Sequence, residues 1–336
     1  MSIKVAQIGL GYWGKNLLRV LNNLGVLSAA FDMDSKVVDK YSKDNLYHNV
    51  YFGTDWETIL TDETIKAVFI ASPPNVHYDM AMKALKAKKH VFIEKPMTLS
   101  VDEAEEIVSY AKECGLIVMV GFIFLYSPEI IKLKSIVDST DFGDINYIYT
   151  ERLNLGQIQA CGCLYDLMPH DISIVEYITA ETCNSVSAFG VSNVLNGVED
   201  VVFINMKYGD TLVHLHLSWL NPLKVRNTVV VGTKQMAVCD SINKRIDIYN
   251  KSVDISAMAN NMSIDYARHL LSYRYGDVVS PHIETYEPLT EECKEFISCI
   301  DEGREPLSSG SVGLSTVKTL VAARDSLTKN GEWVEL

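Results

Sequence analysis

The first residues of the chain place a glycine-rich turn between a strand and a helix. Residues 3–8 (IKVAQI) form a short run of mainly apolar residues, and residues 15–24 have the pattern of a helix. Between them lie Gly9, Gly11 and Gly14, in the spacing G-x-G-x-x-G. In this setting the first glycine permits a tight turn, the second lets a ligand approach the backbone, and the third lets helix and strand pack closely. The pattern therefore predicts a turn that cradles the phosphates of a dinucleotide at the start of a helix.

The rest of the first 120 residues repeats this alternation of strands and helices. We expect strands at 27–31, 66–71, 90–93 and 116–120, and helices at 35–44, 76–88 and 100–114. Strands that alternate with helices form right-handed βαβ units and a parallel sheet. We therefore predict an α/β Rossmann dinucleotide-binding domain over residues 1–122.

The pattern changes after Gly121, because strands now follow one another without helices between them. We expect helices at 128–138 and 165–179, and strands at 145–153, 185–192, 200–208, 211–219, 225–232, 235–240 and 245–250. Consecutive strands favour an antiparallel sheet. Residues 251–288 show no clear period, so we interpret them as a long loop. We expect two closing helices, at 289–302 and 311–329, and a short last strand at 332–334.

The second domain, residues 123–336, is thus predicted to be an α+β domain with a large open, mostly antiparallel sheet. Its role would be substrate binding and oligomerisation, and its C-terminal helices are candidates for packing back on the first domain. A length of 336 residues fits two domains.

The net charge indicates which partners the protein binds, and the cysteine content indicates its cellular compartment. The net charge of −13 opposes binding to nucleic acid, whose phosphates repel such a surface. The seven cysteines are an odd number spread over a long chain, which favours reduced thiols in a cytoplasm over a disulfide framework. There is no signal-peptide pattern and no run near the roughly 18 apolar residues of a membrane span. We expect a soluble cytoplasmic protein that does not associate with membranes.

Asp32 stands at the end of the second predicted strand, 23 positions after Gly9. An acid at this position can bond the ribose hydroxyls of a bound dinucleotide. Met33, Asp34 and Ser35 follow, so a 2′-phosphate would meet two carboxylates and no cation. NAD is therefore favoured over NADP. The alternative is an ordinary glycine-rich turn in which Asp32 caps a helix.

Two further motifs carry groups suited to acid–base chemistry. Strand 90–93 runs into Glu94-Lys95-Pro96, which places Lys95 at the sheet edge where ligands bind. There it could hold a positive charge near a substrate hydroxyl, or form a surface salt bridge. Asp166 and His170 are four residues apart, so they share one face of the predicted helix 165–179. Histidine exchanges protons near neutral pH, although a lone histidine near a helix start is more often structural. Pro169 fits the first turn of a helix better than its interior.

Taken together, these motifs resemble one known family. G-x-G-x-x-G, Ser72-Pro73-Pro74-Asn75-Val76-His77, Glu94-Lys95-Pro96 and Asp166-x-x-x-His170 occur in the order typical of the Gfo/Idh/MocA oxidoreductases. Members act on sugars, inositols or nucleotide sugars with NAD or NADP. The resemblance implies that Lys95, Asp166 and His170 are catalytic. The residues expected around the cofactor are Gly9, Gly11, Tyr12, Trp13, Gly14, Asp32, Ser72, Pro73, Asn75, His77, Glu94 and Lys95.

Other segments resemble a subgroup that acts on nucleotide-linked sugars, such as UDP-N-acetylhexosamine 3-dehydrogenases. We expect the substrate to contact Lys95, Arg152, Asn154, Asp166, His170 and Arg274. Arg152 and Arg274 are candidate contacts for a diphosphate because arginine presents a fork of donors to phosphate oxygens, although a solvated surface arginine is the more common case. The alternatives are a free sugar or inositol dehydrogenase, and a non-catalytic NAD(P)-binding regulator or scaffold. The presence of Lys95 and His170 favours an enzyme.

Weaker signals concern metals and assembly. His214 and His216 share a sheet face and Cys161 and Cys163 form a Cys-x-Cys pair, but neither has the further ligands of a metal site, so no metal is expected. Tyr12 and Trp13 could stack on the ligand or serve packing. The apolar residues on both faces of 211–219 predict that a second copy covers the open sheet, in a homodimer or homotetramer.

Overall fold

The computed structural model describes residues 3–255 and 271–336 and divides the chain into two compact units. The first unit comprises Met1–Tyr126 and Glu287–Val321, and the second comprises Ser127–Tyr286 and Ala322–Leu336. The last boundary falls within helix α9 (Gly310–Thr328). Because residues 287–321 return to the first unit, the division is not a single cut near residue 122.

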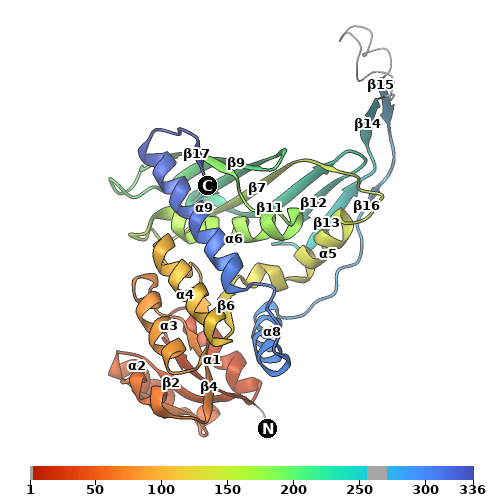
Figure 1. The fold of residues 1–336 in the computed structure, drawn as a ribbon. Coiled ribbons are helices and arrows are strands. Elements are labelled where there is room, and N and C mark those ends of the chain that lie inside the picture. Colours follow the sequence, from red (N-terminus) through yellow and green to blue (C-terminus); the bar gives the residue numbers. More distant parts are fainter. Residues whose placement is uncertain (1–2, 256–270) are drawn as a thin grey trace. The chain divides into compact units, whose positions relative to one another are not determined.

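Six parallel strands form the sheet of the first unit, in the order β3-β2-β1-β4-β5-β6 (Figure 1). Their bounds are β1 Lys4–Ile8, β2 Leu27–Phe31, β3 Tyr51–Gly53, β4 Ile65–Ile70, β5 His90–Glu94 and β6 Val118–Gly121. The predicted parallel sheet is confirmed, although the three-residue edge strand β3 was too short to show a pattern in the sequence. The strand order reverses between β1 and β4, and open parallel sheets bind ligands beside such a point, at the carboxyl ends of the strands.

Helices and short 3₁₀ turns of the first unit lie between these strands or follow the last of them along the chain. Their bounds are α1 Gly14–Asn23, α2 Ser35–Ser42, η1 Asn45–Tyr47, η2 Trp56–Thr61, η3 Pro74–Val76, α3 His77–Lys86, α4 Val101–Cys114, η4 Ile123–Tyr126 and α8 Pro288–Glu302. Helix α1 is amphipathic and buries Leu17, Leu18 and Leu21. Helix α4 ends where Gly115 takes up a left-handed conformation, a common way to terminate a helix.

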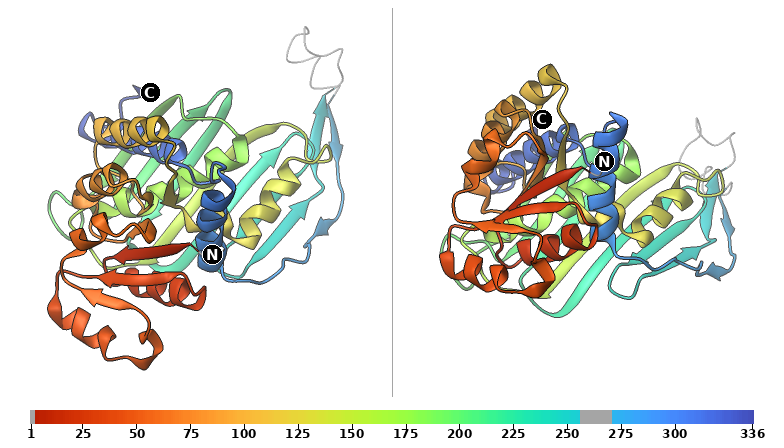
Figure 2. Two further views of the ribbon diagram at one scale, coloured as in Figure 1. Left: turned by 60° about the horizontal axis from the view of Figure 1, so that its bottom comes forward. Right: turned by 90° about the horizontal axis from the view of Figure 1, so that it is seen from below.

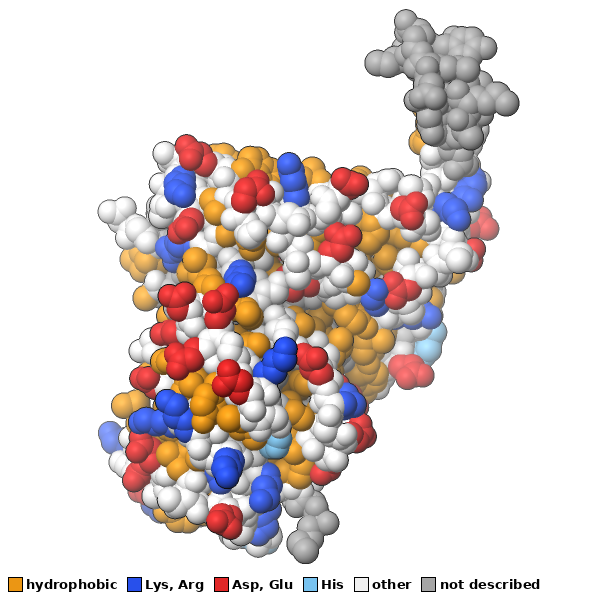
Figure 3. Space-filling view, viewed as in Figure 1, with side chains coloured by type: hydrophobic (Ala, Val, Ile, Leu, Met, Phe, Trp, Pro, Cys, Tyr) orange, Lys and Arg blue, Asp and Glu red, His pale blue; other side chains and the backbone are white. Residues whose placement is uncertain are grey.

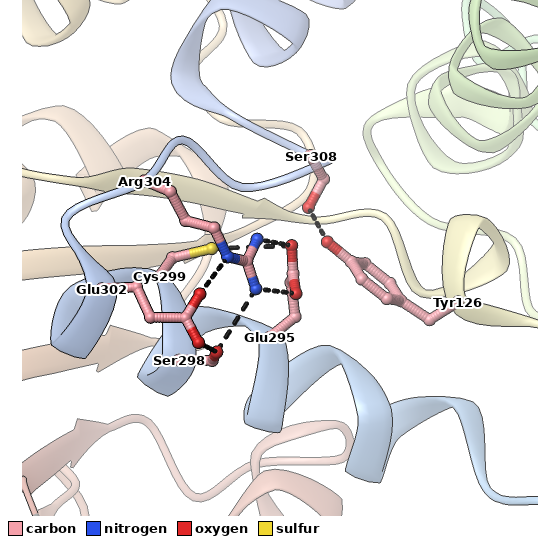
Figure 4. A network of polar contacts seen from close by, with 7 residues as sticks. All are labelled: Tyr126, Glu295, Ser298, Cys299, Glu302, Arg304 and Ser308. Carbon is pink, nitrogen blue, oxygen red and sulfur yellow. Dashed lines mark hydrogen bonds and ion pairs between the residues drawn. The ribbon is translucent and has the colours of Figure 1, made fainter.

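Helix α8 completes the core of the first unit, although it lies far along the chain. Its Phe296 ring packs edge-on against Phe69 of β4 and Phe92 of β5, with ring centroids 5.2 and 5.9 Å apart. Beyond the helix, Arg304 donates two hydrogen bonds to the Glu295 carboxylate, at 2.7 and 2.8 Å (Figure 4). The Tyr126 hydroxyl, at the end of η4, is 3.0 Å from that of Ser308, so η4 is tied to the segment that follows α8.

Nine strands form the sheet of the second unit, in the order β16-β13-β12-β11-β7-β10-β9-β8-β17. Their bounds are β7 Ile145–Leu155, β8 Ser185–Val191, β9 Val201–Tyr208, β10 Thr211–Ser218, β11 Leu220–Gly232, β12 Met236–Asp240, β13 Arg245–Tyr249, β16 Val278–Val279 and β17 Val334–Glu335. The sheet is mixed, since β10 pairs with β9 antiparallel and with β7 in parallel. The predicted large, mostly antiparallel sheet is thus confirmed, with one parallel pair at its centre.

Helices α5 (Pro128–Val137) and α6 (Gly162–Thr179) lie against one face of this sheet (Figure 2). Helix α6 contacts β7, β9 and β10, and α5 contacts β12 and β13. Strand β10 turns Val213, Leu215 and Leu217 into the buried core. Its alternate residues lie on the opposite face, where His216 stacks on Phe203 with ring centroids 4.4 Å apart.

The segment interpreted from the sequence as a long loop, residues 251–288, contains regular structure at both described ends. Strands β14 (Ser252–Ile255) and β15 (Leu271–Arg274) pair antiparallel as a two-stranded sheet. Strand β16 then joins the edge of β13. The loop interpretation was therefore wrong for these strands, which are too short to show a period. Residues 256–270 of the predicted loop lie outside the described residues.

Two surface properties bear on partners. Within the described ranges, none of the helices has the length and apolar character needed to span a lipid bilayer. On the face drawn in Figure 3, acidic and basic side chains are interspersed over the described surface.

Candidate active site

The three glycines of the turn after β1 have three different environments. Gly9 has φ +92°, and a Cβ there would lie 2.4 Å from the Ala71 carbonyl oxygen. A Cβ on Gly14 would lie 2.1 Å from the Gly9 carbonyl oxygen. A Cβ on Gly11 would meet no described atom within 4 Å. Gly9 and Gly14 are therefore required by the turn itself, while Gly11 leaves its backbone open to a ligand, as a pyrophosphate requires.

Gln7 stabilises the glycine turn through its side chain, and the sequence analysis did not identify it. Its side chain is fully buried, and Nε2 donates to the carbonyl oxygens of Gly9 at 2.9 Å and Gly14 at 2.7 Å. One amide thus holds both ends of the glycine turn. A polar residue within the apolar run 5–8 was the signal that could have revealed it, because buried polar groups need partners.

The start of α1 suits an anion. Among the described residues no side chain caps this helix at Trp13, and the first turn contains no acidic residue. The first amide N–H groups of a helix have no partner within it, and they lie at the positive end of its dipole. With the open backbone of Gly11, this end of α1 fits the diphosphate of a dinucleotide.

Asp32 is bonded to the glycine turn and does not cap a helix. Its Oδ2 accepts a hydrogen bond from the Leu10 amide at 2.8 Å, and its Oδ1 accepts one from the Asp34 amide at 3.0 Å. The residue that caps α2 is Asp34, which accepts from the Lys36 amide at 2.9 Å. The structure thus contradicts the helix cap that the alternative assigned to Asp32, which lies partly exposed beside the turn.

The segment after β4 contains both exposed residues and one buried histidine. Pro73 and Asn75 are exposed, and Ser72 is partly exposed. His77 is fully buried, with Nδ1 3.0 Å from the Pro96 carbonyl oxygen and Nε2 2.7 Å from that of Ser72. Burial lowers the pKa of His77. His77 therefore ties the segment after β4 to the one after β5, whereas the other three residues are accessible to a ligand.

Glu94 and Lys95 lie at the carboxyl end of β5. The Glu94 carboxylate is buried and accepts a hydrogen bond from the Trp13 indole N–H. Burial raises the pKa of Glu94 to about 7. Lys95 is partly exposed, as a ligand contact requires. The two aromatic residues of the turn differ in exposure. The Tyr12 side chain is 86% exposed to solvent, whereas the Trp13 indole donates a hydrogen bond to the buried Glu94.

In the second unit, Asp166 and His170 lie one turn apart on α6, and both are partly exposed. The Trp219 indole N–H donates to Asp166 Oδ2 at 3.3 Å. The helix begins at Gly162, so the expectation that Pro169 lies in a first turn was wrong. Pro169 is in the interior, where it cannot donate to the Tyr165 carbonyl. The helix nonetheless presents an acid and an imidazole on the same face.

Arg152 is buried rather than available to a ligand. Its guanidinium pairs with the Asp171 carboxylate through two hydrogen bonds of 2.9 Å, and the two side chains are 4% and 2% exposed. This geometry gives no support to the prediction that Arg152 contacts a substrate diphosphate. Asp171 follows His170 directly in α6, so the pair anchors that part of the helix to β7.

A second arginine, missed in the sequence, lies near Asn154. Arg226 on β11 donates to the Asn154 side-chain oxygen at 2.7 Å and to the Leu153 carbonyl at 2.9 Å. Burial, with repulsion from Arg152, lowers the pKa of Arg226 to about 10. Its guanidinium thus stays charged at neutral pH beside Asn154, which is partly exposed. No motif reveals this pairing, because β7 and β11 meet only through the sheet.

Arg274 is exposed on β15 and donates to the Lys234 carbonyl oxygen at 2.5 Å. It therefore belongs to the two-stranded sheet of β14 and β15. None of the seven cysteines, all of which are described, forms a disulfide bond; Cys161 is exposed and Cys163 is buried. In the described ranges no three potential ligands come together as a metal site would need.

Comparison with known proteins identifies both parts of the chain. Residues 3–122 match the oxidoreductase family with an NAD-binding Rossmann fold, and residues 130–238 match the GFO/IDH/MocA C-terminal domain. An uncharacterized oxidoreductase of Bacillus subtilis, YrbE, is 28% identical over 291 residues, which cover 82% of this chain and 80% of YrbE. The scyllo-inositol 2-dehydrogenase (NAD(+)) of the same organism is 24% identical, with 100% of this chain and 96% of that protein covered.

Among solved structures, the UDP-N-acetylglucosamine 3-dehydrogenase GnnA from Acidithiobacillus ferrooxidans superposes with a TM-score of 0.83. The match covers 98% of this chain and 99% of GnnA at 21% identity, and so shows a shared fold. The family matches together cover more than half of the chain, in both units. The chain therefore belongs to the Gfo/Idh/MocA family of NAD-binding oxidoreductases, which act on CH–OH groups.

Proposed function

We propose that the protein is an NAD-dependent dehydrogenase of a secondary alcohol on a nucleotide-linked sugar of the UDP-N-acetylhexosamine type. The observation that carries the proposal is the pair of partly exposed groups, Asp166 and His170, one turn apart on α6. A dehydrogenase of this kind needs a base for the hydroxyl proton, and an imidazole supplies one near neutral pH. A fold shared over nearly the full length with a UDP-N-acetylglucosamine 3-dehydrogenase supports the substrate class.

The choice of NAD rests on Asp32. Its carboxylate is fixed beside the glycine turn by the Leu10 and Asp34 amides, and Asp34 adds a second negative charge nearby. Both would repel a 2′-phosphate, whereas a ribose diol can donate hydrogen bonds to Asp32. The name of the scyllo-inositol relative also includes NAD(+).

In the proposed reaction, each site residue has a separate role. Bound NAD supplies the acceptor for the hydride that leaves the carbon. His170 takes the proton of the hydroxyl on that carbon, and Asp166, held by Trp219, orients the imidazole or a neighbouring hydroxyl. The Lys95 ammonium stabilises the negative charge that develops on the oxygen. The glycine turn, the start of α1 and Asp32 hold the diphosphate and ribose, and Ser72, Pro73 and Asn75 present further contacts.

A second candidate is a free sugar or inositol dehydrogenase, and the Arg152–Asp171 pair favours it. Because that pair occupies Arg152, the second unit offers one fewer cation for a diphosphate than the sequence predicted. Relatives named inositol dehydrogenases fit the same candidate. Asn154 and Arg226 would serve either substrate class, as donors to hydroxyl or phosphate oxygens.

Assembly and location complete the proposal. The face of the large sheet opposite α5 and α6 exposes the apolar side chains of Tyr147, Phe203 and Leu212, at 44%, 44% and 48%. A second copy packed against them would form the homodimer or homotetramer expected from the sequence. We also propose a cytoplasmic location, from the seven reduced cysteines.

The test is to identify copurifying ligands by mass spectrometry and then to measure NAD reduction with UDP-sugars and with free polyols. Reduction with a UDP-N-acetylhexosamine at a kcat/KM at least about tenfold above that with the free sugars supports the proposal. The reverse order assigns the protein to the free sugar and inositol dehydrogenases. Binding of NAD without reduction by either class would contradict both.

A further inference from the structure

The buried carboxylate of Glu94 lies where three segments of the first unit meet. The Trp13 indole N–H donates to it from the glycine turn, across 81 residues of sequence. A Cβ on Gly121 of β6 would lie 3.0 Å from its carboxyl atoms, so the neighbouring strand leaves no space for a larger residue. Glu94 was expected to contact the cofactor, but its carboxylate is buried and bonded to Trp13. It can therefore act on the cofactor through the glycine turn.

A second buried acid lies on α8. Glu292 is fully buried, and neither of its carboxylate oxygens has a hydrogen-bond partner among the described residues. The proposed reaction makes no use of it. A buried ionised carboxylate without partners is costly, so this group is expected to hold a proton. Helix α8 is held in the first unit by Phe296, so Glu292 has a fixed position there.

The two acids interact electrostatically. Burial, and next the charge of Glu94, hold the pKa of Glu292 well above its ordinary value. Burial raises the pKa of Glu94 to about 7, and the Trp13 hydrogen bond and the Lys95 charge limit the rise. The Cys293 thiol, next to Glu292 on α8, has its pKa raised well above the usual value by burial and by both acids. Near neutral pH, Glu292 and Cys293 are therefore both uncharged.

Two other titratable groups face this cluster. Burial holds the pKa of the Tyr126 hydroxyl, at the end of η4, far above neutrality, so this hydroxyl stays protonated. Glu287, just before α8, acts on Cys293 but pairs with Arg19, which lowers its own pKa. Glu287 thus keeps its negative charge near neutral pH. Glu94 is the group of this cluster that changes charge there.

We propose that Glu94 is a positioning residue: ionised beside a neutral Glu292, it holds Trp13 and thereby sets the glycine turn for cofactor binding. A hydrogen bond from an indole to a carboxylate is stronger than one to a neutral carboxyl group. As the pH falls through about 7, Glu94 gains a proton and its hold on Trp13 weakens. The turn is therefore held more firmly above this pH than below it. The part that concerns NAD rests on the proposed function, but the link between the two acids and Trp13 does not.

The first test needs no cofactor. The protein has four tryptophans, and the ¹⁵N-labelled indole signal of Trp13 is assigned by its loss in Trp13→Phe. We expect this signal to shift between about pH 5.5 and 8.5, with a midpoint near 7, and to stop shifting in Glu94→Gln, which keeps an acceptor oxygen but cannot ionise. A Trp13 signal that does not move over this range in the parent protein overturns the proposal.

Glu292→Gln tests which acid holds the proton. Glutamine has the size and neutrality of the protonated acid, so the midpoint of the Trp13 signal should remain within about half a pH unit of the parent value. If Glu292 were ionised, its replacement would remove a negative charge near Glu94 and lower the midpoint by more than about one unit. That result would overturn the assignment of a neutral Glu292.

The second test measures the affinity for NADH by calorimetry at about pH 8 and pH 6. We expect Trp13→Phe and Glu94→Gln each to weaken binding about tenfold at the higher pH and much less at the lower pH. Trp56→Phe, on η2 of the same unit, is the matched control and should bind like the parent. Equal affinity of the parent and Trp13→Phe at both pH values overturns the inference but leaves the proposed function intact. Failure of the parent to bind NADH counts against the proposed function, while the cofactor-free test still decides the link.

Discussion

Asp32 Oδ2 accepts a hydrogen bond from the Leu10 amide at 2.8 Å, so the acid that ends β2 is fixed to the glycine turn that follows β1. Because of this contact, a substitution of Asp32 alone tests the preference for NAD over NADP. We expect the parent protein to bind NAD more tightly than NADP, because Asp32 and Asp34 repel a 2′-phosphate. Asp32→Ala should reduce the NAD-to-NADP affinity ratio by about tenfold or more, measured by calorimetry.

Asp44→Ala is the control for this prediction. Asp44 is also an exposed acid that accepts a backbone hydrogen bond, from Leu46 at the start of η1. Its removal should leave the ratio unchanged. Tighter binding of NADP than of NAD by the parent would contradict the predicted role of Asp32.

Lys95→Met and His170→Ala test the catalytic assignment. With a confirmed substrate, we expect each change to slow hydride transfer by about 10²–10⁴-fold, because each removes a group that moves a proton or stabilises charge. Both variants should still bind NAD, since neither residue forms the glycine turn. Stopped-flow measurement of NADH formation gives the rates. Lys66→Met and His48→Ala, which alter exposed residues of the first unit, should react like the parent. Parent-like rates in both test variants would show that the chemistry lies elsewhere.

The buried ion pair between Arg152 and Asp171 makes a prediction about stability. Asp171→Asn should lower the free energy of unfolding by about 3–5 kcal/mol, because it leaves the Arg152 guanidinium buried without its counter-charge. Denaturant titration in a Trp13→Phe, Trp56→Phe background, where the remaining Trp219 and Trp333 both belong to the second unit, measures this change by fluorescence. Asp39→Asn breaks the exposed pair with Lys43 and should have little effect. A similar small change in Asp171→Asn would show that Arg152 is not held by this acid.

Assembly can be tested on the uncovered face of the large sheet. Leu212 is 48% exposed there, so Leu212→Glu should leave the fold intact while placing a charge in the predicted interface. We expect the parent to sediment as a dimer or tetramer at micromolar concentration and the variant as a smaller species. Leu46→Glu, at a position 71% exposed in the first unit, should sediment like the parent. A monomeric parent would rule out the predicted assembly.

The sequence predicted those features that depend on local order along the chain. Gly9, Gly11 and Gly14 have a fixed spacing between a strand and a helix, and Asp32 ends the next strand. Their positions follow once the strands are parallel, because parallel strands bring their carboxyl ends to one edge. The helical repeat likewise predicted that Asp166 and His170 share a helix face, and the family resemblance implied their role.

The features that sequence reasoning missed depend on contacts between distant segments. Gln7 looks like an irregularity in an apolar strand until its two carbonyl partners are seen. Arg226 reaches Asn154 only because β11 lies beside β7. Arginine is a residue type that often contacts phosphate, and only the position of α6 shows that Arg152 forms an ion pair with Asp171. Such partners are set by register and packing, which no local pattern records.

The route of the chain also has a consequence for how the protein is made. The first unit needs α8, whose Phe296 covers Phe69 and Phe92, but residues 127–286 are synthesised before it. At about 5–20 residues per second, a ribosome takes on the order of ten to thirty seconds to cross that interval. During this time the nascent sheet exposes aromatic rings that the finished protein buries. The first unit therefore begins to form first but stays incomplete until α8 is synthesised, and its sheet is open to non-native contacts during that interval.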